Sequence, residues 1–140
     1  MIKTPTQALD ELASELDLFE DDWEERYRYI IDLGRTLAPL SERERCDLNK
    51  VRGCASQVWL VVEPAGERLR FRGDSDAHIV RGLIAILLRL YSDRTREEIA
   101  AFDAKAATAR LGLANALSSQ RANGLVAMVE RIRREAGAVA

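Results

Sequence analysis

The feature that most constrains this chain is its longest apolar stretch, at residues 79–91, which is interrupted only by Arg81 and Arg89. A membrane-spanning helix needs about 20 predominantly apolar residues, so this stretch is too short to cross a bilayer. It predicts instead a helix buried in a globular core, with Asp76 placed to cap its start. A chain of 140 residues, 47% of them hydrophobic, can close one ordinary core. We therefore expect one domain over residues 1–140.

A β-hairpin is predicted just before this helix. Residues 57–62 are rich in β-branched and aromatic side chains, and residues 64–66 form a plausible turn. The return strand, residues 68–72, alternates Arg with Leu69 and Phe71, which is typical of a strand with one buried face. Residues 73–76 are expected to end the hairpin. Two strands need covering, so helices must pack on them.

Capping patterns predict the other helices. Thr4, Pro5 and Gln7 begin a short first helix, and Asp22 with Glu25 begins a second. The second helix carries an apolar face that comprises Trp23, Tyr27, Ile30, Ile31 and Leu37. Ser41 with Glu44 predicts a further turn, followed by a loop at residues 46–53. Further starts are predicted at Thr95 with Glu98 and at Ser118 or Ser119, where the last helix places Leu125, Met128, Val129 and Ile132 on one side. The expected fold is α+β, a small antiparallel sheet packed against several α-helices.

Charge argues against a nucleic-acid or membrane partner. The chain has 21 basic and 23 acidic residues, so its formal charge of −2 gives no field that favours phosphate backbones or anionic lipid. The arginine runs at residues 68–72 and 131–134 are interpreted as solvated faces, with a partner-protein patch as the alternative. Residues 1–5 lack the features of a secretory signal, so we expect a cytoplasmic protein whose two cysteines stay reduced.

The residues with the clearest chemical potential are Gly53, Cys54, Ala55 and Ser56. A cysteine between glycine and small residues, just before a strand, can lie on a tight turn where backbone N–H groups favour its thiolate. That is a setting for a nucleophile. The alternative is a structural role, because free cysteine is also among the most buried residue types.

Other kinds of site are poorly supported. A cysteine hydrolase needs a base, and the only histidine, His78, is expected at the surface near the start of the buried helix. Cys46 and Cys54 have no partners to complete a zinc or iron–sulfur site, so no metal is expected. Residues 73–76 resemble the beginning of a calcium loop, but neither its central glycine nor its closing glutamate follows.

Several blocks of sequence resemble the SufE/CsdE family of sulfur acceptor proteins. The blocks are residues 23–27, 29–34, 51–60, 73–77, 79–84 and 119–125, and they cover about residues 20–137 in the family order. Residues 1–19 lie outside the resemblance and are expected to form an N-terminal helix or extension.

The resemblance implies a function for Cys54. In that family the thiol lies on a loop beside the sheet, and the partner is a pyridoxal-phosphate-dependent cysteine desulfurase of the SufS/CsdA type. The cofactor belongs to the partner, so none is expected in this chain. Cys54 would take sulfur from the partner's persulfide, stimulate the partner and pass the sulfur to an iron–sulfur scaffold. The chain would then be an accessory transfer protein rather than a stand-alone enzyme.

The resemblance also assigns Gly53, Ser56, Gln57, Asp76 and Arg121 to the loop around Cys54 or to partner contact. Cys46 is not required by the family pattern, and a homodimer stays open. We expect Cys54 to be partly buried beside Val58 or Trp59, because an exposed persulfide would be lost to reductants. Two alternatives remain, a binding module that acts on the desulfurase by allostery and a thiol peroxidase that uses Cys54 alone.

Overall fold

The structure is a computed structural model that describes residues 3–137. The ends of the predicted domain, residues 1–2 and 138–140, lie outside the described residues. The elements in chain order are α1 (Pro5–Asp17), α2 (Trp23–Arg35), the 3-10 helix η1 (Asp47–Asn49), β1 (Val58–Ala65), β2 (Arg68–Ser75), α3 (His78–Tyr91), β3 (Arg94–Thr95), α4 (Arg96–Ala101), α5 (Ala104–Arg110), α6 (Leu113–Ala116) and α7 (Ser119–Glu135). The strands form one antiparallel sheet in the order β1-β2-β3. The predicted α+β class and single domain are confirmed.

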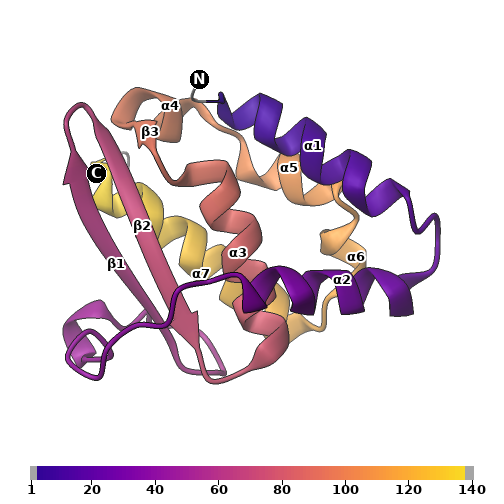
Figure 1. Cartoon of the computed structure of the whole chain (residues 1–140), viewed down its shortest axis with the longest axis horizontal. Helices are drawn as coiled ribbons and strands as arrows, with labels where there is room; N and C mark the ends of the chain where they lie inside the picture. Colours follow the sequence, from indigo (N-terminus) through magenta and orange to yellow (C-terminus); the bar gives the residue numbers. More distant parts are fainter. Residues whose placement is uncertain (1–2, 138–140) are drawn as a thin grey trace.

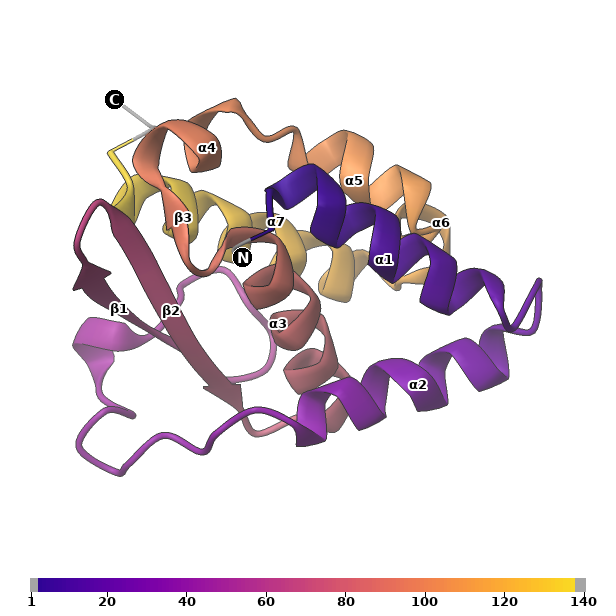
Figure 2. The same ribbon diagram turned by 45° about the horizontal axis from the view of Figure 1, so that its top comes forward.

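Helix α3 is the buried helix that the apolar stretch predicts. It contacts α1, α2, α7 and β2, and Figures 1 and 2 show it between the hairpin and helices α1 and α2. The two arginines that interrupt the stretch both reach carboxylates. Arg81 lies 3.1 Å from Asp74, and Arg89 donates two hydrogen bonds, of 2.8 and 2.6 Å, to Glu15. The apolar face of α3 therefore stays in the core while its charges are paired at the edge.

Helices α2 and α3 cross with their backbones in contact. A Cβ on Gly82 would lie 2.2 Å from the carbonyl oxygen of Ile30, and one on Gly34 would lie 2.6 Å from the nitrogen of Gly82. Both distances are far below any real van der Waals contact. Only glycine at both positions allows this close packing.

Four of the predicted helix starts are confirmed, those of α1, α2, α4 and α7. Capping boxes are present at Thr4 and at Thr95, and the side chains of Asp22 and Ser118 cap α2 and α7. Helix α1, however, has 13 residues and is not short. On the predicted apolar face of α2 only Ile30 is fully buried, and the other four residues are half-buried. Leu37 lies beyond the helix, which ends at Arg35.

The hairpin is longer than predicted. Its turn falls at residues 66–67, where Gly66 has a φ of +65°, and β2 continues to Ser75. The hairpin therefore ends within residues 73–76, as expected, although residues 73–75 still belong to β2, which was predicted to end at residue 72. A Cβ on Gly73 would lie 2.7 Å from Ile84 and 2.9 Å from Leu60, so this glycine lets the strand run against α3 instead of turning away.

Candidate functional site

A long connection between α2 and β1, residues 36–57, carries Cys54. Its first half makes the turn predicted at Ser41, where Ser41 and Glu44 exchange hydrogen bonds between side chain and backbone. The predicted loop at residues 46–53 is irregular except for η1. Such a connection needs side-chain contacts to hold it, because it has little secondary structure of its own.

Asp74 supplies the first of these contacts. Its carboxylate is 2% exposed, lies 2.7 Å from Arg45 and accepts a 3.4 Å hydrogen bond from the N–H of Leu40. Burial would raise the pKa of Asp74, but the Ser75 N–H, Arg45, the Leu40 N–H and the charge of Arg81 together lower it below its usual value. The buried carboxylate is therefore charged, and it ties the start of the connection to β2 and α3.

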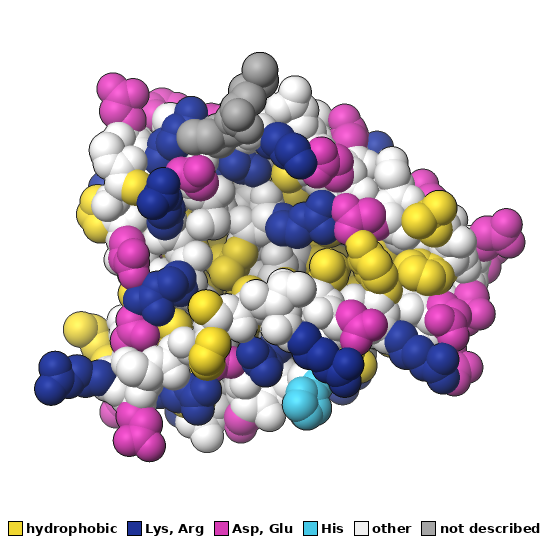
Figure 3. Space-filling model, viewed as in Figure 1, with side chains coloured by type: hydrophobic (Ala, Val, Ile, Leu, Met, Phe, Trp, Pro, Cys, Tyr) yellow, Lys and Arg dark blue, Asp and Glu magenta, His cyan; other side chains and the backbone are white. Residues whose placement is uncertain are grey.

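Helix α7 supplies the second contact. Arg131 donates hydrogen bonds of 2.9 Å to the carbonyl of Leu48 and 3.0 Å to that of Lys50, and its Nε donates to Glu135. These bonds fix the backbone of η1 against the end of α7. In the two runs of arginine, Arg68 and Arg72 pair with carboxylates and Arg131 is engaged with η1 and Glu135, and Figure 3 shows both signs of charge mixed over the face drawn.

The Cys54 loop is closed by β1. The N–H of Val51 donates a 2.8 Å hydrogen bond to the carbonyl of Val58, and Lys50 forms a β-bridge with Trp59. Cys54 lies between these paired ends. Gly53, at a φ of +91°, allows the sharp turn before it, in a left-handed conformation that disfavours other residues.

Asp76 has a different role from the one predicted. It does not cap α3, because that helix starts at His78, its N-cap is Ala77, and no side chain makes the cap. Asp76 instead accepts a 3.1 Å hydrogen bond from the N–H of Gln57, and its own N–H donates to the Gln57 carbonyl at 3.4 Å. Because α3 starts only at His78, Asp76 lies in the segment between β2 and α3, where its side chain can accept from the Gln57 N–H just before β1. Asp76 therefore ties the end of the Cys54 loop.

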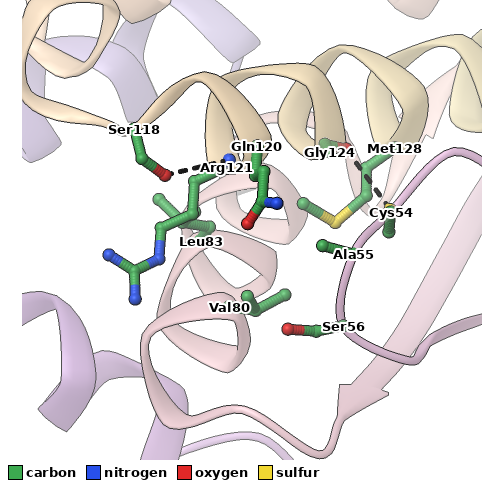
Figure 4. Close-up of a pocket in the computed structure, with 10 residues that line it drawn as sticks. All are labelled: Cys54, Ala55, Ser56, Val80, Leu83, Ser118, Gln120, Arg121, Gly124 and Met128. Carbon is green, nitrogen blue, oxygen red and sulfur yellow. Dashed lines mark hydrogen bonds between the residues drawn. The ribbon is translucent and has the colours of Figure 1, made fainter.

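Cys54 opens into a pocket of about 240 Å³ between the loop, α3 and α7. The lining residues, shown in Figure 4, are Cys54, Ala55, Ser56, Val80, Leu83, Ser118, Gln120, Arg121, Gly124 and Met128. In this view Ser118 and Arg121 lie at one end and Cys54 at the other. The pocket is therefore apolar beside the thiol and polar toward the start of α7.

The thiol is half-buried and protonated at rest. Its Sγ donates a 3.6 Å hydrogen bond to the carbonyl of Gly124, and burial raises the pKa of Cys54 above its usual value. A thiol that donates to a carbonyl must carry its proton, so the bond and the raised pKa agree. A Cβ on Gly124 would lie 3.7 Å from Sγ, an ordinary contact. The sulfur is therefore sheltered without being tightly packed.

Partial burial agrees with the expectation, and the pocket adds apolar residues that were not foreseen. Val80, Leu83 and Met128 line the pocket with Cys54, whereas Val58 and Trp59 do not. The side chains of Val58 and Trp59 are themselves buried. Sequence reasoning missed the walls from α3 and α7, although a glycine inside a predicted helix, Gly124, signals close approach of another segment.

The structure brings the predicted site residues together. Ser56 and Arg121 share the pocket with Cys54, Gly53 precedes it, and Gln57 is exposed at the end of the loop. Cys46 and His78 do not line this pocket. Both are exposed, and both cysteines are free thiols.

The described residues offer no obvious alternative chemistry. Within residues 3–137, no group of three His, Cys, Asp or Glu side chains is placed to hold a metal ion. None of the helices in the same range is long and apolar enough to cross a membrane. The Cys54 pocket is thus the candidate site that the structure supports best.

Known proteins resemble this chain over nearly its whole length. The family model described as "SufE: Fe-S metabolism associated domain" matches residues 10–136. An uncharacterised SufE-like protein of Rhizobium etli is 53% identical over 133 residues, covering 92% of this chain and 89% of the relative. One of Rhizobium meliloti is 49% identical over 134 residues, covering 93% and 92%.

A solved structure shares the fold. The solution structure of a hypothetical protein from Thermus thermophilus has a TM-score of 0.72 to this chain and covers 95% of it, with 93% of its own length aligned. At 17% identity this likeness concerns the fold alone. The family match and the two close relatives carry the assignment: the chain belongs to the SufE family, which acts in sulfur transfer and iron–sulfur metabolism.

Proposed function

We propose that this chain accepts sulfur on Cys54 from the persulfide of a separate, pyridoxal-phosphate-dependent cysteine desulfurase and passes it to an iron–sulfur scaffold. The observation that carries the proposal is the half-buried Cys54 thiol that lines a pocket of about 240 Å³. The family's association with iron–sulfur metabolism supports the donor and the recipient. The chain itself then needs no cofactor and serves as an accessory to the partner's catalysis.

The proposed transfer moves one sulfur atom from the desulfurase cysteine to Cys54. The Cys54 thiolate attacks the outer sulfur of the enzyme persulfide, the S–S bond of that persulfide breaks, and the desulfurase cysteine leaves as a thiolate. A new S–S bond forms on Cys54, so no external oxidant or reductant is required. The rate depends on the thiolate fraction, the nucleophilicity and the access of the attacking thiol, as in thiol–disulfide exchange. The thiols must stay reduced, which fits the cytoplasm.

The resting site supports storage better than attack. Burial keeps Cys54 protonated and bonded to the Gly124 carbonyl, which shelters a bound persulfide but lowers the thiolate fraction. The hydrogen bond from Gln57 to Asp76 closes the loop at one end, and the Val51 bond closes it at the other. Docking must therefore expose the sulfur or lower its pKa before transfer.

The test is a sulfur-loading assay with the two thiols as matched variants. Wild-type protein incubated with a cysteine desulfurase and free cysteine should gain the mass of one sulfur atom on the peptide that contains Cys54. Cys54→Ser should lose both the gain and the stimulation of the desulfurase while still binding it. Cys46→Ser should behave as wild type, because an exposed thiol outside the pocket has no step in the exchange.

Other outcomes would overturn the proposal. Stimulation that survives in Cys54→Ser would indicate a binding module that acts by allostery. Rapid oxidation of Cys54 by peroxide, with no sulfur gain from the desulfurase, would indicate a thiol peroxidase. Loss of transfer in Cys46→Ser but not in Cys54→Ser would show that the acceptor is misassigned.

A further inference from the structure

Leu48, in η1, is the most exposed large apolar side chain that the structure describes. It is 85% exposed, against 80% for Leu18 and 57% for Val126. Single exposed leucines are common on protein surfaces and need no explanation by themselves. What distinguishes Leu48 is how firmly its backbone is held.

The turn that carries Leu48 is fixed on both sides. Arg131 donates to the Leu48 carbonyl at 2.9 Å and to the Lys50 carbonyl at 3.0 Å, and it is itself held by Glu135. The side-chain amide of Asn49 donates a 2.9 Å hydrogen bond to the Glu44 carbonyl. An apolar side chain projected from a fixed backbone loses little conformational entropy on binding. Leu48 is therefore preorganised for contact.

Leu48 lies on the same braced segment as Cys54. It is six positions earlier in the chain, so their Cα atoms are at most about 20 Å apart even if the segment were fully extended. Positions on α7 hold both ends of this segment, since Arg131 binds η1 and Gly124 accepts from Cys54. A standard interface covers about 800 Å² on each partner, a patch roughly 30 Å across. A protein that covers Cys54 can therefore also reach Leu48.

We infer that Leu48 is the apolar anchor by which the cysteine desulfurase docks, inserting into an apolar recess on the desulfurase surface that covers the Cys54 loop. The inference rests on the proposed function, because sulfur transfer requires the donor to cover the Cys54 loop. Exposed polar residues flank Leu48 and Cys54, among them Asp47 and Arg52. An apolar centre with a polar rim is the usual anatomy of an interface, and a few such anchors carry most of the binding energy.

The test measures desulfurase stimulation as a function of the concentration of this chain. Leu48→Ser should raise the half-saturating concentration about tenfold and leave the maximal stimulation unchanged, because it removes a docking contact and no reacting group. Leu48→Met should stay within about twofold of wild type, since it keeps the apolar contact. The matched control is Leu18→Ser, at the end of α1, which lies across the molecule from η1 in both Figures 1 and 2.

The outcomes separate this inference from the proposed function. Equal half-saturating concentrations for Leu48→Ser and Leu18→Ser would overturn the anchor, even where Cys54 still gains sulfur. A dimer of wild-type chain that Leu48→Ser converts to monomer, with docking unchanged, would assign Leu48 to a second copy and would also overturn it. Failure of wild-type Cys54 to gain sulfur would instead refute the proposed function. Calorimetric binding to the desulfurase in the Cys54→Ser background should show the same tenfold loss for Leu48→Ser without any chemistry.

Discussion

The crossing of α2 and α3 and the Cys54 pocket are packed in opposite ways. At the crossing, a single methyl group on Gly82 would overlap the backbone of Ile30. At the pocket, a methyl group on Gly124 would make an ordinary contact with Cys54, and open space lies beside it. One region has no room to adjust, whereas the other holds the Cys54 thiol in a loop tied by a few hydrogen bonds. The difference suggests that stability is concentrated away from the site, which leaves the site free to open.

The largest expected effect comes from disrupting the close packing of α2 against α3. Gly82→Ala should lower the free energy of unfolding by about 3 kcal/mol, because α2 and α3 must separate to admit the methyl group. Gly124→Ala is the matched control, a buried glycine in another helix interior. It should be neutral or stabilise by up to about 1 kcal/mol, because alanine favours a helix and the space exists. Urea denaturation measures both, and equal losses would refute the contrast.

The second prediction concerns Asp74, which ties the connection that carries Cys54 to helix α3. Asp74→Asn should lower the free energy of unfolding by about 2 kcal/mol near neutral pH, because it leaves Arg45 and Arg81 without their buried carboxylate. The pKa of Asp74 is lowered in the folded state, so its stabilisation is complete above the pKa of unfolded Asp, about 4. It is lost as the pH falls through the folded pKa.

The difference between wild type and Asp74→Asn should therefore shrink in acid. Urea denaturation near neutral pH and at about pH 3 measures it. Asp32→Asn, which removes an exposed pair with Arg35, should change stability by less than about 0.5 kcal/mol at either pH. A constant difference for Asp74→Asn across this range would contradict the assigned role.

The third effect probes the sheltered thiol directly. Cys54 should react with iodoacetamide at least about tenfold more slowly than exposed Cys46 near neutral pH, because burial raises its pKa and limits access. Mass spectrometry of the two peptides over time gives both rates. The Cys54 rate should rise with pH, and the gap should close in urea, where both thiols are exposed. Equal rates in the folded protein would show that Cys54 is not sheltered.

The smallest expected effect compares two helix caps, of which one, Ser118, lines the Cys54 pocket. Ser118→Ala and Thr95→Ala each remove a helix cap and should each cost about 1 kcal/mol in urea denaturation. Only Ser118 lines the Cys54 pocket, so only its loss should speed the alkylation of Cys54. An equal change in alkylation for Thr95→Ala would mean that the rate reports global stability rather than the pocket.

Local patterns predicted most of the fold. The caps at Thr4, Asp22, Thr95 and Ser118 were all identified from the sequence, as were the buried helix and the hairpin. These features depend on hydrogen bonds and periodicity between near neighbours, so a single sequence carries them. The hairpin length was misjudged because Gly73 resembled a turn residue when it was in fact a close contact with α3.

The sequence by itself determined the α+β class, the single core and the candidate nucleophile, Cys54. Only the tertiary structure decided what surrounds the sulfur, because the pocket joins residues 54–56, 80–83 and 118–128, which are far apart in the chain. It also decided the role of Asp76. The position of this residue just before α3 predicts a helix cap, but in the folded chain its side chain binds the N–H of Gln57 instead. Neighbours along the chain fix a helix start, whereas the environment of a thiol depends on which distant elements pack against it, and that follows from the whole core.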